Sequence, residues 1–182
     1  LPSLDMDYRS VCRHAAGTFL SKGHRRMALI VPNSAVAGDL ASEEGFLEAI
    51  EQRNKEGDAR ATIVRHNGTA QNITLKLDAL FNSAHAPTAL LVAKPQYVFI
   101  VIIYLLKRGL TVPDTVSLIA RDHDHTFEIV SPPIAHYSFE CDAFEHRLSR
   151  LMLQMVGEGR LDCESNLIFP KYFAGGTVKQ LR

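Results

Sequence analysis

Blocks of continuous apolar residues alternate along the chain with blocks in which apolar residues recur every three or four positions. Continuous apolar blocks are typical of strands buried on both faces, and the wider spacing is typical of helices that pack by one face. The predicted strands cover residues 26–31, 61–65, 88–93 and 116–120. The predicted helices cover residues 8–20, 42–57, 72–83 and 95–108. This order predicts an α/β fold in which a parallel sheet carries helices on both faces.

The predictions of two of these helices depend on residues that are typical of helix ends. Ser42 is expected to cap the helix at residues 42–57, which has carboxylates in its first turn and Gly57 at its end. The block at residues 95–108 is rich in β-branched residues, which would also suit a strand. Pro95 in a first turn and basic residues at the other end favour a buried helix there.

The last third of the chain has a different pattern. An extended segment is predicted at residues 134–138, and an amphipathic helix at residues 142–156. Two short strand-like pieces follow, at residues 165–170 and 171–177. The helix has one apolar face, made of Phe144, Leu148, Leu151, Met152 and Met155.

Composition excludes two classes of function for this segment. Lys+Arg and Asp+Glu are both 20, so the net charge is zero and no basic surplus exists with which to bind DNA by itself. The longest apolar run, residues 97–106, is half as long as the roughly 20 residues that a membrane-spanning helix needs. The N-terminus has neither a starting Met nor a signal-peptide pattern, so we expect a fragment cut from a longer chain.

The cysteines indicate an intracellular protein. Cys12, Cys141 and Cys163 are odd in number and have no CxxC spacing. They are predicted to be free thiols, with Cys12 and Cys141 on buried helix faces.

Polar side chains follow each predicted strand at the point where the strand ends. In an open parallel sheet these ends share one edge, and ligands bind there. The residues placed at this edge are Asn33, Ser34, Arg65–Asn67, Lys94, Gln96 and Arg121–His125. Helix N-termini near Ser42 and Pro95 should offer free N–H groups to the same edge. Asp122 is the residue expected to touch a ligand, because a carboxylate there can accept two hydroxyl hydrogen bonds from a sugar or another polyol.

The cluster Asp122–His125 has three interpretations: a metal site, a catalytic group, or loop residues in solvent. Residues that leave a strand alternate sides, so the two aspartates should face one way and the two histidines the other. Consecutive residues therefore cannot all reach one ion, and we expect no metal site and solvated side chains for His123, Asp124 and His125. The chain has no GxSxG, GxGxxG or GxxxxGK[ST] motif. An enzyme would have to use Asp122, His123 and His136 as acid/base groups.

Six segments occur in an order and spacing that resemble the bacterial LacI/GalR transcription regulators. They are "GHRRMALIVP", "EEGFLEAI", "PTALLVA", "LLKRGLTVPDTVSLIARDHD", "SPPIAHYSFE" and "FPKYFAGGT". Each segment is modest alone, whereas the six in register cover nearly the whole chain. The resemblance implies a periplasmic-binding-protein-like (type I) lobe that binds a small-molecule effector, a sugar or sugar derivative, in a cleft between two lobes. It implies a cytoplasmic sensor that is not an enzyme and uses no cofactor.

The resemblance also implies how the chain is divided. Residues 8–132 would form the complete C-terminal lobe, and residues 133–182 would return into the N-terminal lobe. The helix-turn-helix that reads operator DNA, and most of the N-terminal lobe, would lie upstream of Leu1. Solute-binding proteins of transport systems share the two-lobed fold and are the alternative.

Departures from the family pattern bear on the effector. Where the family often has an arginine that grips the effector, this chain has Ser42, and where it often has Asn-Asp after the third strand, this chain has Lys94 and a proline. Asp122 keeps its type in the family's Gly-Tyr/Phe-Asp-Asp, and Asp5, near the family's aspartate at the first crossover, is a second candidate. Lys94 is expected either to reach an anionic effector or to pair with Asp122. Arg121 is expected to be a surface charge.

The helix at residues 142–156 would pack, in this family, against first-lobe strands that the chain lacks. An apolar face of that size is expected to be exposed or covered by a partner chain. We therefore predict a homodimer, or self-association through this region.

Overall fold

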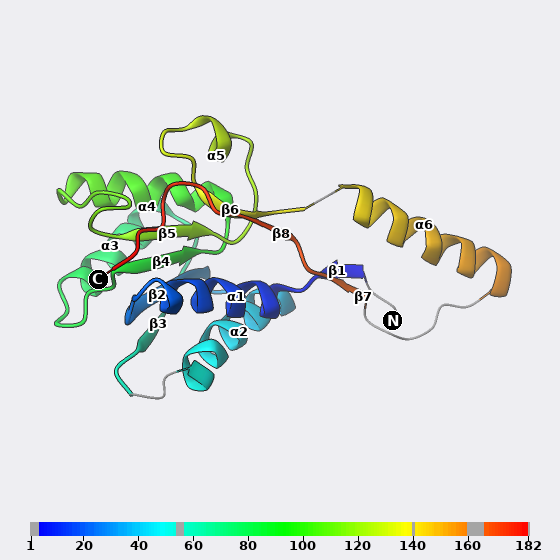
Figure 1. Cartoon of the computed structure of the whole chain (residues 1–182), viewed down its shortest axis with the longest axis horizontal. Coiled ribbons are helices and arrows are strands. Elements are labelled where there is room, and N and C mark those ends of the chain that lie inside the picture. The colour runs from blue at the N-terminus through cyan, green and yellow to red at the C-terminus, as the bar shows by residue number, and fades with distance from the viewer. Residues whose placement is uncertain (1–3, 54–56, 140, 160–165, 182) are drawn as a thin grey trace.

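A computed structural model describes residues 4–53, 57–139, 141–159 and 166–181, which form a helix-covered sheet and an arm that extends from it (Figure 1). The elements in chain order are β1 (Leu4–Met6), α1 (Tyr8–Ser21), β2 (Arg26–Pro32), α2 (Ala37–Arg53), β3 (Arg60–His66), α3 (Ala70–Phe81), β4 (Ala89–Val92), α4 (Pro95–Lys107), β5 (Ser117–Ala120), α5 (Thr126–Ile129), β6 (Ala135–Ser138), α6 (Cys141–Glu158), β7 (Asn166–Ile168) and β8 (Lys171–Phe173). The predicted α/β fold is confirmed.

The main sheet has six strands in the order β3-β2-β4-β5-β6-β8. Strands β2 to β6 pair in parallel, and β8 pairs antiparallel with β6 at one edge. β1 and β7 form a separate parallel pair. Since the predicted strands all run the same way, their carboxyl ends share one edge, as the sequence indicated.

Alternate residues of the central strands fill two cores, one on each face of the sheet. In β2, Met27 and Leu29 pack with residues of α1 and α2, whereas Ala28 and Ile30 pack with residues of α3 and α4. The strands read as continuously apolar because each is buried on both faces. The block at Pro95–Lys107 is a helix, as its end signals predicted.

Helix α2 begins earlier than predicted. The prediction that Ser42 caps a helix starting there is wrong, because α2 begins at Ala37. Ser42 lies inside the helix, and its hydroxyl donates to the Gly38 carbonyl oxygen at 2.7 Å. A serine inside a helix commonly bonds back in this way to the residue four positions earlier. The first turn of α2 instead carries Asp39.

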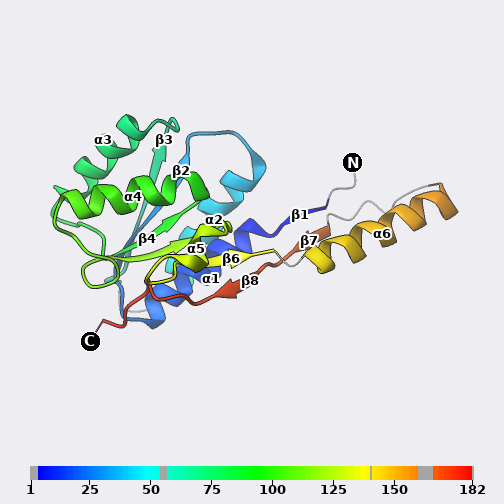
Figure 2. The ribbon, with the colours of Figure 1, turned by 90° about the horizontal axis from the view of Figure 1, so that it is seen from above.

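An arm made of β1, α6 and β7 projects from one end of the main sheet (Figure 2). The chain passes between sheet and arm three times, from β1 into α1, from β6 into α6, and from β7 into β8. The region 133–182 thus contributes both to the main sheet and to the arm, and the predicted lobe boundary after residue 132 stays a prediction. Neither α6 nor any other helix in the described ranges is long and apolar enough to cross a membrane.

The segment after β8 runs back along the main sheet, at the end opposite to the carboxyl edge. The Thr177 hydroxyl donates to the Leu118 carbonyl at 2.7 Å, and the Lys179 N–H donates to the Ser117 hydroxyl at 2.9 Å. The Leu181 N–H donates to the Lys22 carbonyl at 2.8 Å. These bonds attach the end of the chain to the start of β5 and to the end of α1.

Helices α1 and α2 lie so close that a glycine is required between them. A Cβ on Gly45 would lie 2.0 Å from the carbonyl oxygen of Arg9, far inside van der Waals contact. The two helices together cover one face of the sheet, so their spacing sets how that core is filled.

We expect Gly45→Ala to lower the free energy of unfolding by about 1–3 kcal/mol, because the added methyl group forces the two helices apart. Gly157→Ala in α6 is the control, since an added Cβ there meets nothing within 4 Å. The control should leave stability unchanged or raise it by up to about 1 kcal/mol. Urea denaturation measures both, and an unchanged Gly45→Ala midpoint would contradict the close packing.

Candidate functional site

A buried ionic cluster lies at the carboxyl edge of the sheet. Arg121, the residue after β5, has 0% of its side chain exposed, so the prediction that it is a surface charge is wrong. Its guanidinium lies 3.0 Å from the carboxylate of Asp39 in α2 and 3.0 Å from that of Asp122. It also donates to the Ser42 hydroxyl at 2.9 Å. A buried cation requires this kind of pairing, since an isolated buried charge would cost several kcal/mol.

Tyr8, at the start of α1, covers this guanidinium. The carbon of the Arg121 guanidinium lies 4.2 Å from the centre of the Tyr8 ring, a cation–π contact. Burial raises the pKa of the Tyr8 hydroxyl, and the negative charges of Asp122 and Asp5 raise that pKa further. Asp5, a predicted site residue on β1, therefore lies in the electrostatic neighbourhood of the cluster.

Asp39 connects the cluster to the ends of β2 and β4. Burial pulls its pKa upward, but hydrogen bonds from Ser34 and Arg121 outweigh burial and hold the pKa of this carboxyl below its usual range. The Ser34 hydroxyl donates to Asp39 at 2.7 Å. The positive charge of Lys94 lowers the same pKa, so this side chain acts on Asp39. Among the described residues Lys94 makes no ion pair with Asp122, and its expected role toward an anionic effector stays a prediction.

The remaining predicted site residues differ in exposure. Asn33 and Gln96 are exposed at the same edge, after β2 and in the first turn of α4. Asp122 has 18% of its side chain exposed. Ser42 is fully buried, donating to Gly38 and accepting from Arg121. Asn33, Gln96 and Asp122 thus have side-chain surface exposed at this edge, and their contact with a ligand stays a prediction.

Two residues of the edge, Asp39 and Tyr8, were missed by sequence reasoning. Asp39 was missed because the start of α2 was misplaced, and a helix starting at Ala37 would have put it in the first turn. Tyr8 was missed because it fits the apolar face of the predicted helix at residues 8–20. His66, which the sequence placed at this edge, is buried at the end of β3, and its ring lies edge-on to Tyr97, with ring centres 4.5 Å apart.

The edge offers hydrogen-bond acceptors and a cation, and its buried thiol is unreactive. Cys12 is buried in α1, as predicted, and burial raises the pKa of its thiol to about 12. A thiol with that pKa stays protonated near neutral pH and is a poor nucleophile. The Cys141 side chain and Cys163 lie outside the described residues.

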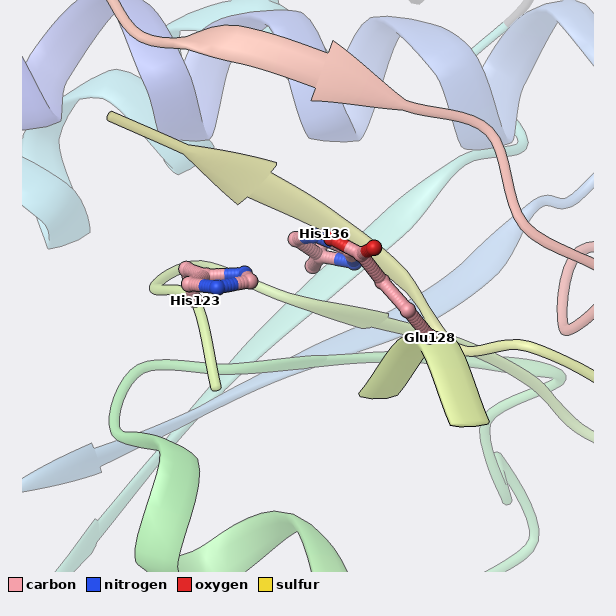
Figure 3. A group of neighbouring side chains, drawn as sticks. All are labelled: His123, Glu128 and His136. Carbon is pink, nitrogen blue, oxygen red and sulfur yellow. Dashed lines mark ion pairs between the residues drawn. The ribbon is translucent and has the colours of Figure 1, made fainter. Parts of the chain in front are cut away.

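A second group of polar side chains lies beside the edge. His123 from the loop after β5, Glu128 from α5 and His136 from β6 are turned toward one another (Figure 3). Their nearest donor atoms all lie within 4.8 Å of one another, so this group can in principle hold a metal ion.

Of the predicted alternation of sides after β5, the structure bears out the nearness of the two histidines. The rings of His123 and His125 lie near each other, with centres 5.1 Å apart. His125 is exposed, and Asp124 accepts the Thr126 N–H at 2.9 Å. The prediction of a solvated side chain is wrong for His123, whose Nδ1 is buried.

The comparisons with known proteins identify a family and a fold. The model of the periplasmic binding protein-like domain matches residues 16–178. Among proteins of curated function, no significant sequence match is found. Many solved structures share the fold.

Transcription regulators are among these structures. One is a LacI family transcriptional regulator from Enterococcus faecium with bound ribose, with 18% identity and a TM-score of 0.81, covering 100% of this chain and 66% of that chain. Another is the transcription regulator CcpA of Lactococcus lactis, with 15% identity and a TM-score of 0.79, covering 98% and 65%. A third is a sugar-binding LacI family regulator from Escherichia coli complexed with phosphate, with 16% identity and a TM-score of 0.79, covering 97% and 63%. The chain spans just under two thirds of the length of each, and at these identities the likeness concerns the fold.

We expect Arg121→Met to lower the free energy of unfolding by about 3–5 kcal/mol, because it leaves Asp39 and Asp122 without their buried counter-charge. Arg25→Met is the control, since Arg25 pairs with Asp58 in solvent, with side chains 44% and 49% exposed. The control should cost about 1 kcal/mol or less. Urea denaturation measures both, and similar losses for the two variants would show that the cluster adds little.

Proposed function

Because the chain belongs to the periplasmic binding protein-like domain family, we propose that it is the effector-sensing part of a LacI-type transcription regulator. Three observations support this function: the six segments that resemble the LacI/GalR regulators, the shared fold of solved regulators, and a polar edge where such domains bind ligands. The proposed activity is binding without catalysis, in the cytoplasm.

The main structural support for this proposal is the geometry of Asp122. Each of its two carboxylate oxygens accepts one N–H of Arg121 at 3.0 Å, which fixes the plane of the carboxylate. Each oxygen keeps a further lone pair, and the side chain is partly exposed at the edge. A carboxylate held in this way can accept two hydroxyl groups of a sugar or sugar derivative. In the structure from Enterococcus faecium the bound molecule is ribose.

The other predicted residues take different roles in the proposal. Asp5, Asn33 and Gln96 are exposed and would face the effector directly. Lys94 would contact an anionic group such as a sugar acid or a sugar phosphate. Ser34 and Ser42 have their hydroxyls engaged within the cluster, so they would position Asp39 and Arg121.

Effector binding would be transmitted through the three segments that connect the main sheet to the arm. The main sheet and the arm are joined by three passes of the chain, which is the arrangement needed for one lobe to rotate on another. An effector held between two lobes favours the closed arrangement by its difference in affinity for the two states. Operator DNA would be bound by a helix-turn-helix elsewhere in the full-length protein.

We also propose that the chain self-associates through α6. The apolar side chains of this helix are largely exposed, among them Leu148 at 40%, Met152 at 60%, Leu153 at 74% and Val156 at 85%. Large apolar side chains gathered in the open on one helix mark a surface for contact with another chain.

A solute-binding protein of a transport system is the second candidate, because the matching family description names periplasmic binding proteins. The first sixty or so residues of the full-length gene separate the two: a helix-turn-helix favours regulation, and a secretory signal favours transport.

We expect the full-length protein to bind a sugar or sugar acid, and Asp122→Asn to weaken that binding by about 10- to 100-fold, since a hydrogen bond to a charged group is worth about 1.5–3 kcal/mol. Thermal shift identifies the ligand, and isothermal titration measures the dissociation constant. Asp114→Asn, at a carboxylate that is 73% exposed and paired with Lys179, is the control and should bind like wild type. Equal affinity of Asp122→Asn and wild type would refute the role of Asp122.

We expect the 182-residue chain to elute as a dimer and Leu148→Glu to elute as a monomer, because a buried carboxylate would disrupt an apolar interface. Leu75→Glu in α3 is the control, at a side chain that is 60% exposed on another face, and it should remain dimeric. Size-exclusion chromatography with light scattering measures both. Elution of wild type and Leu148→Glu alike as monomers would rule out the proposed interface.

A further inference from the structure

The hydrogen bonding of His136 leaves the lone pair of its Nε2 available to a ligand. Its Nδ1 lies 2.8 Å from the carbonyl oxygen of Ile134, so Nδ1 carries the proton and donates it to that carbonyl. The proton-free Nε2 is buried and has no hydrogen-bond partner among the described residues. Metal-binding histidines show this arrangement, in which one nitrogen donates to a carbonyl and the other faces the ion. The residue itself is 1% exposed and its ring stacks on Phe173, with centres 5.1 Å apart, so the lone pair has a fixed direction.

His123 supplies a second nitrogen of the same kind. Its Nδ1 is buried and, within the described part of the chain, also lacks a hydrogen-bond partner. The centres of the His123 and His136 rings lie 5.0 Å apart. Two buried imidazole nitrogens without partners are costly to fold unless something satisfies them, which points to a bound species between the rings.

Glu128 adds a carboxylate to the two nitrogens. Its Oε1 lies 3.9 Å from Nε2 of His136, and its side chain is 57% exposed. Figure 3 shows the carboxylate extending from α5 to the side of the His136 ring. One donor atom from each of the three residues lies within 4.8 Å of the other two. Donors of a bound ion at about 2.0–2.2 Å stand closer together than this, so binding requires the exposed Glu128 and the partly buried His123 to rotate toward His136.

We propose that His123, Glu128 and His136 form a binding site for a transition-metal ion of the Zn²⁺ class. Two imidazole nitrogens and one carboxylate suit Zn²⁺, Co²⁺ and Ni²⁺, whereas Mg²⁺ and Ca²⁺ prefer oxygen ligands alone. Three protein ligands leave a fourth position for solvent or for a donor atom of a ligand.

The proposed site lies between the polar edge and β6, the strand from which the chain passes into α6. His123 directly follows Asp122, and His136 lies in β6, which leads to α6 in the arm. An ion bound here ties the loop after β5 and helix α5 to that strand. Metal binding therefore stiffens the segment that carries Asp122, without requiring any effector at the edge.

The test is metal binding by the full-length protein after removal of metal with a chelator. We expect one Zn²⁺ per chain by isothermal titration, and at a free Zn²⁺ concentration 100 times the dissociation constant a rise of about 5–10 °C in the melting temperature. Mg²⁺ and Ca²⁺ should leave the melting temperature unchanged. Crystals grown with Zn²⁺ should show anomalous density between the three side chains.

Two variants and one control decide the site. His123→Ala and Glu128→Gln should each weaken Zn²⁺ binding by more than about 100-fold, because removing even outer-shell partners costs about 10–100-fold. Glu128→Gln alters an exposed side chain and keeps the test open if His123→Ala folds poorly. His85→Ala, at an exposed histidine in the α3–β4 connection, should bind like wild type. Absence of Zn²⁺, Co²⁺ and Ni²⁺ binding, or binding that neither variant weakens, or a water molecule in place of anomalous density, would overturn the proposal.

Discussion

A guanidinium removed from solvent and shared by two carboxylates organises the carboxyl edge of this protein. Within the described part of the chain Arg121 makes four hydrogen bonds, two to Asp122 and one each to Asp39 and Ser42, and one face of its guanidinium is covered by Tyr8. These partners come from the end of β5, from α2 and from α1. Elements that meet at one buried charge cannot shift independently, because any movement leaves an ion without its partner.

The same cluster accounts together for two departures from the LacI/GalR pattern, Ser42 and Arg121. An arginine in place of Ser42 would bring a second guanidinium against Arg121, whose N–H group already bonds at that position. A serine is small and neutral, and its hydroxyl accepts that N–H while donating to Gly38. Ser42 and Arg121 thus fit together in this chain, and in the proposed function the contacts to an effector fall to the carboxylates and Lys94.

The sequence predicted elements whose signals are local. The strands β2, β4 and β5 lie in mainly apolar runs, and α1 and α4 carry recognisable first turns. The start of α2 was misplaced because Ala37–Leu40 includes a glycine and lacks an apolar spacing. β1 and α5 have three and four residues, too few to show a period.

The chemistry of the edge was harder to predict, because it depends on distant partners. Arg121 looks like a surface charge until Asp39, 82 positions away, is placed beside it. Likewise, alternation after β5 placed the two histidines together, but it gave no information on what the fold brings to their side. His136 reaches His123 because β6 pairs with β5. Spacing along a chain cannot show such a meeting.

The bonds from the end of the chain to Lys22, Ser117 and Leu118 have a consequence for biosynthesis. The antiparallel edge strand β8 and the segment that follows it come after α6 and β7 in the sequence. They can therefore join the main sheet only after α6 and β7 have been synthesised. A ribosome must therefore translate beyond Leu181 before this body can complete its hydrogen bonding, and contacts of such long sequence separation form slowly. Until then the nascent chain presents β6 as an open edge, the kind of surface that chaperones protect.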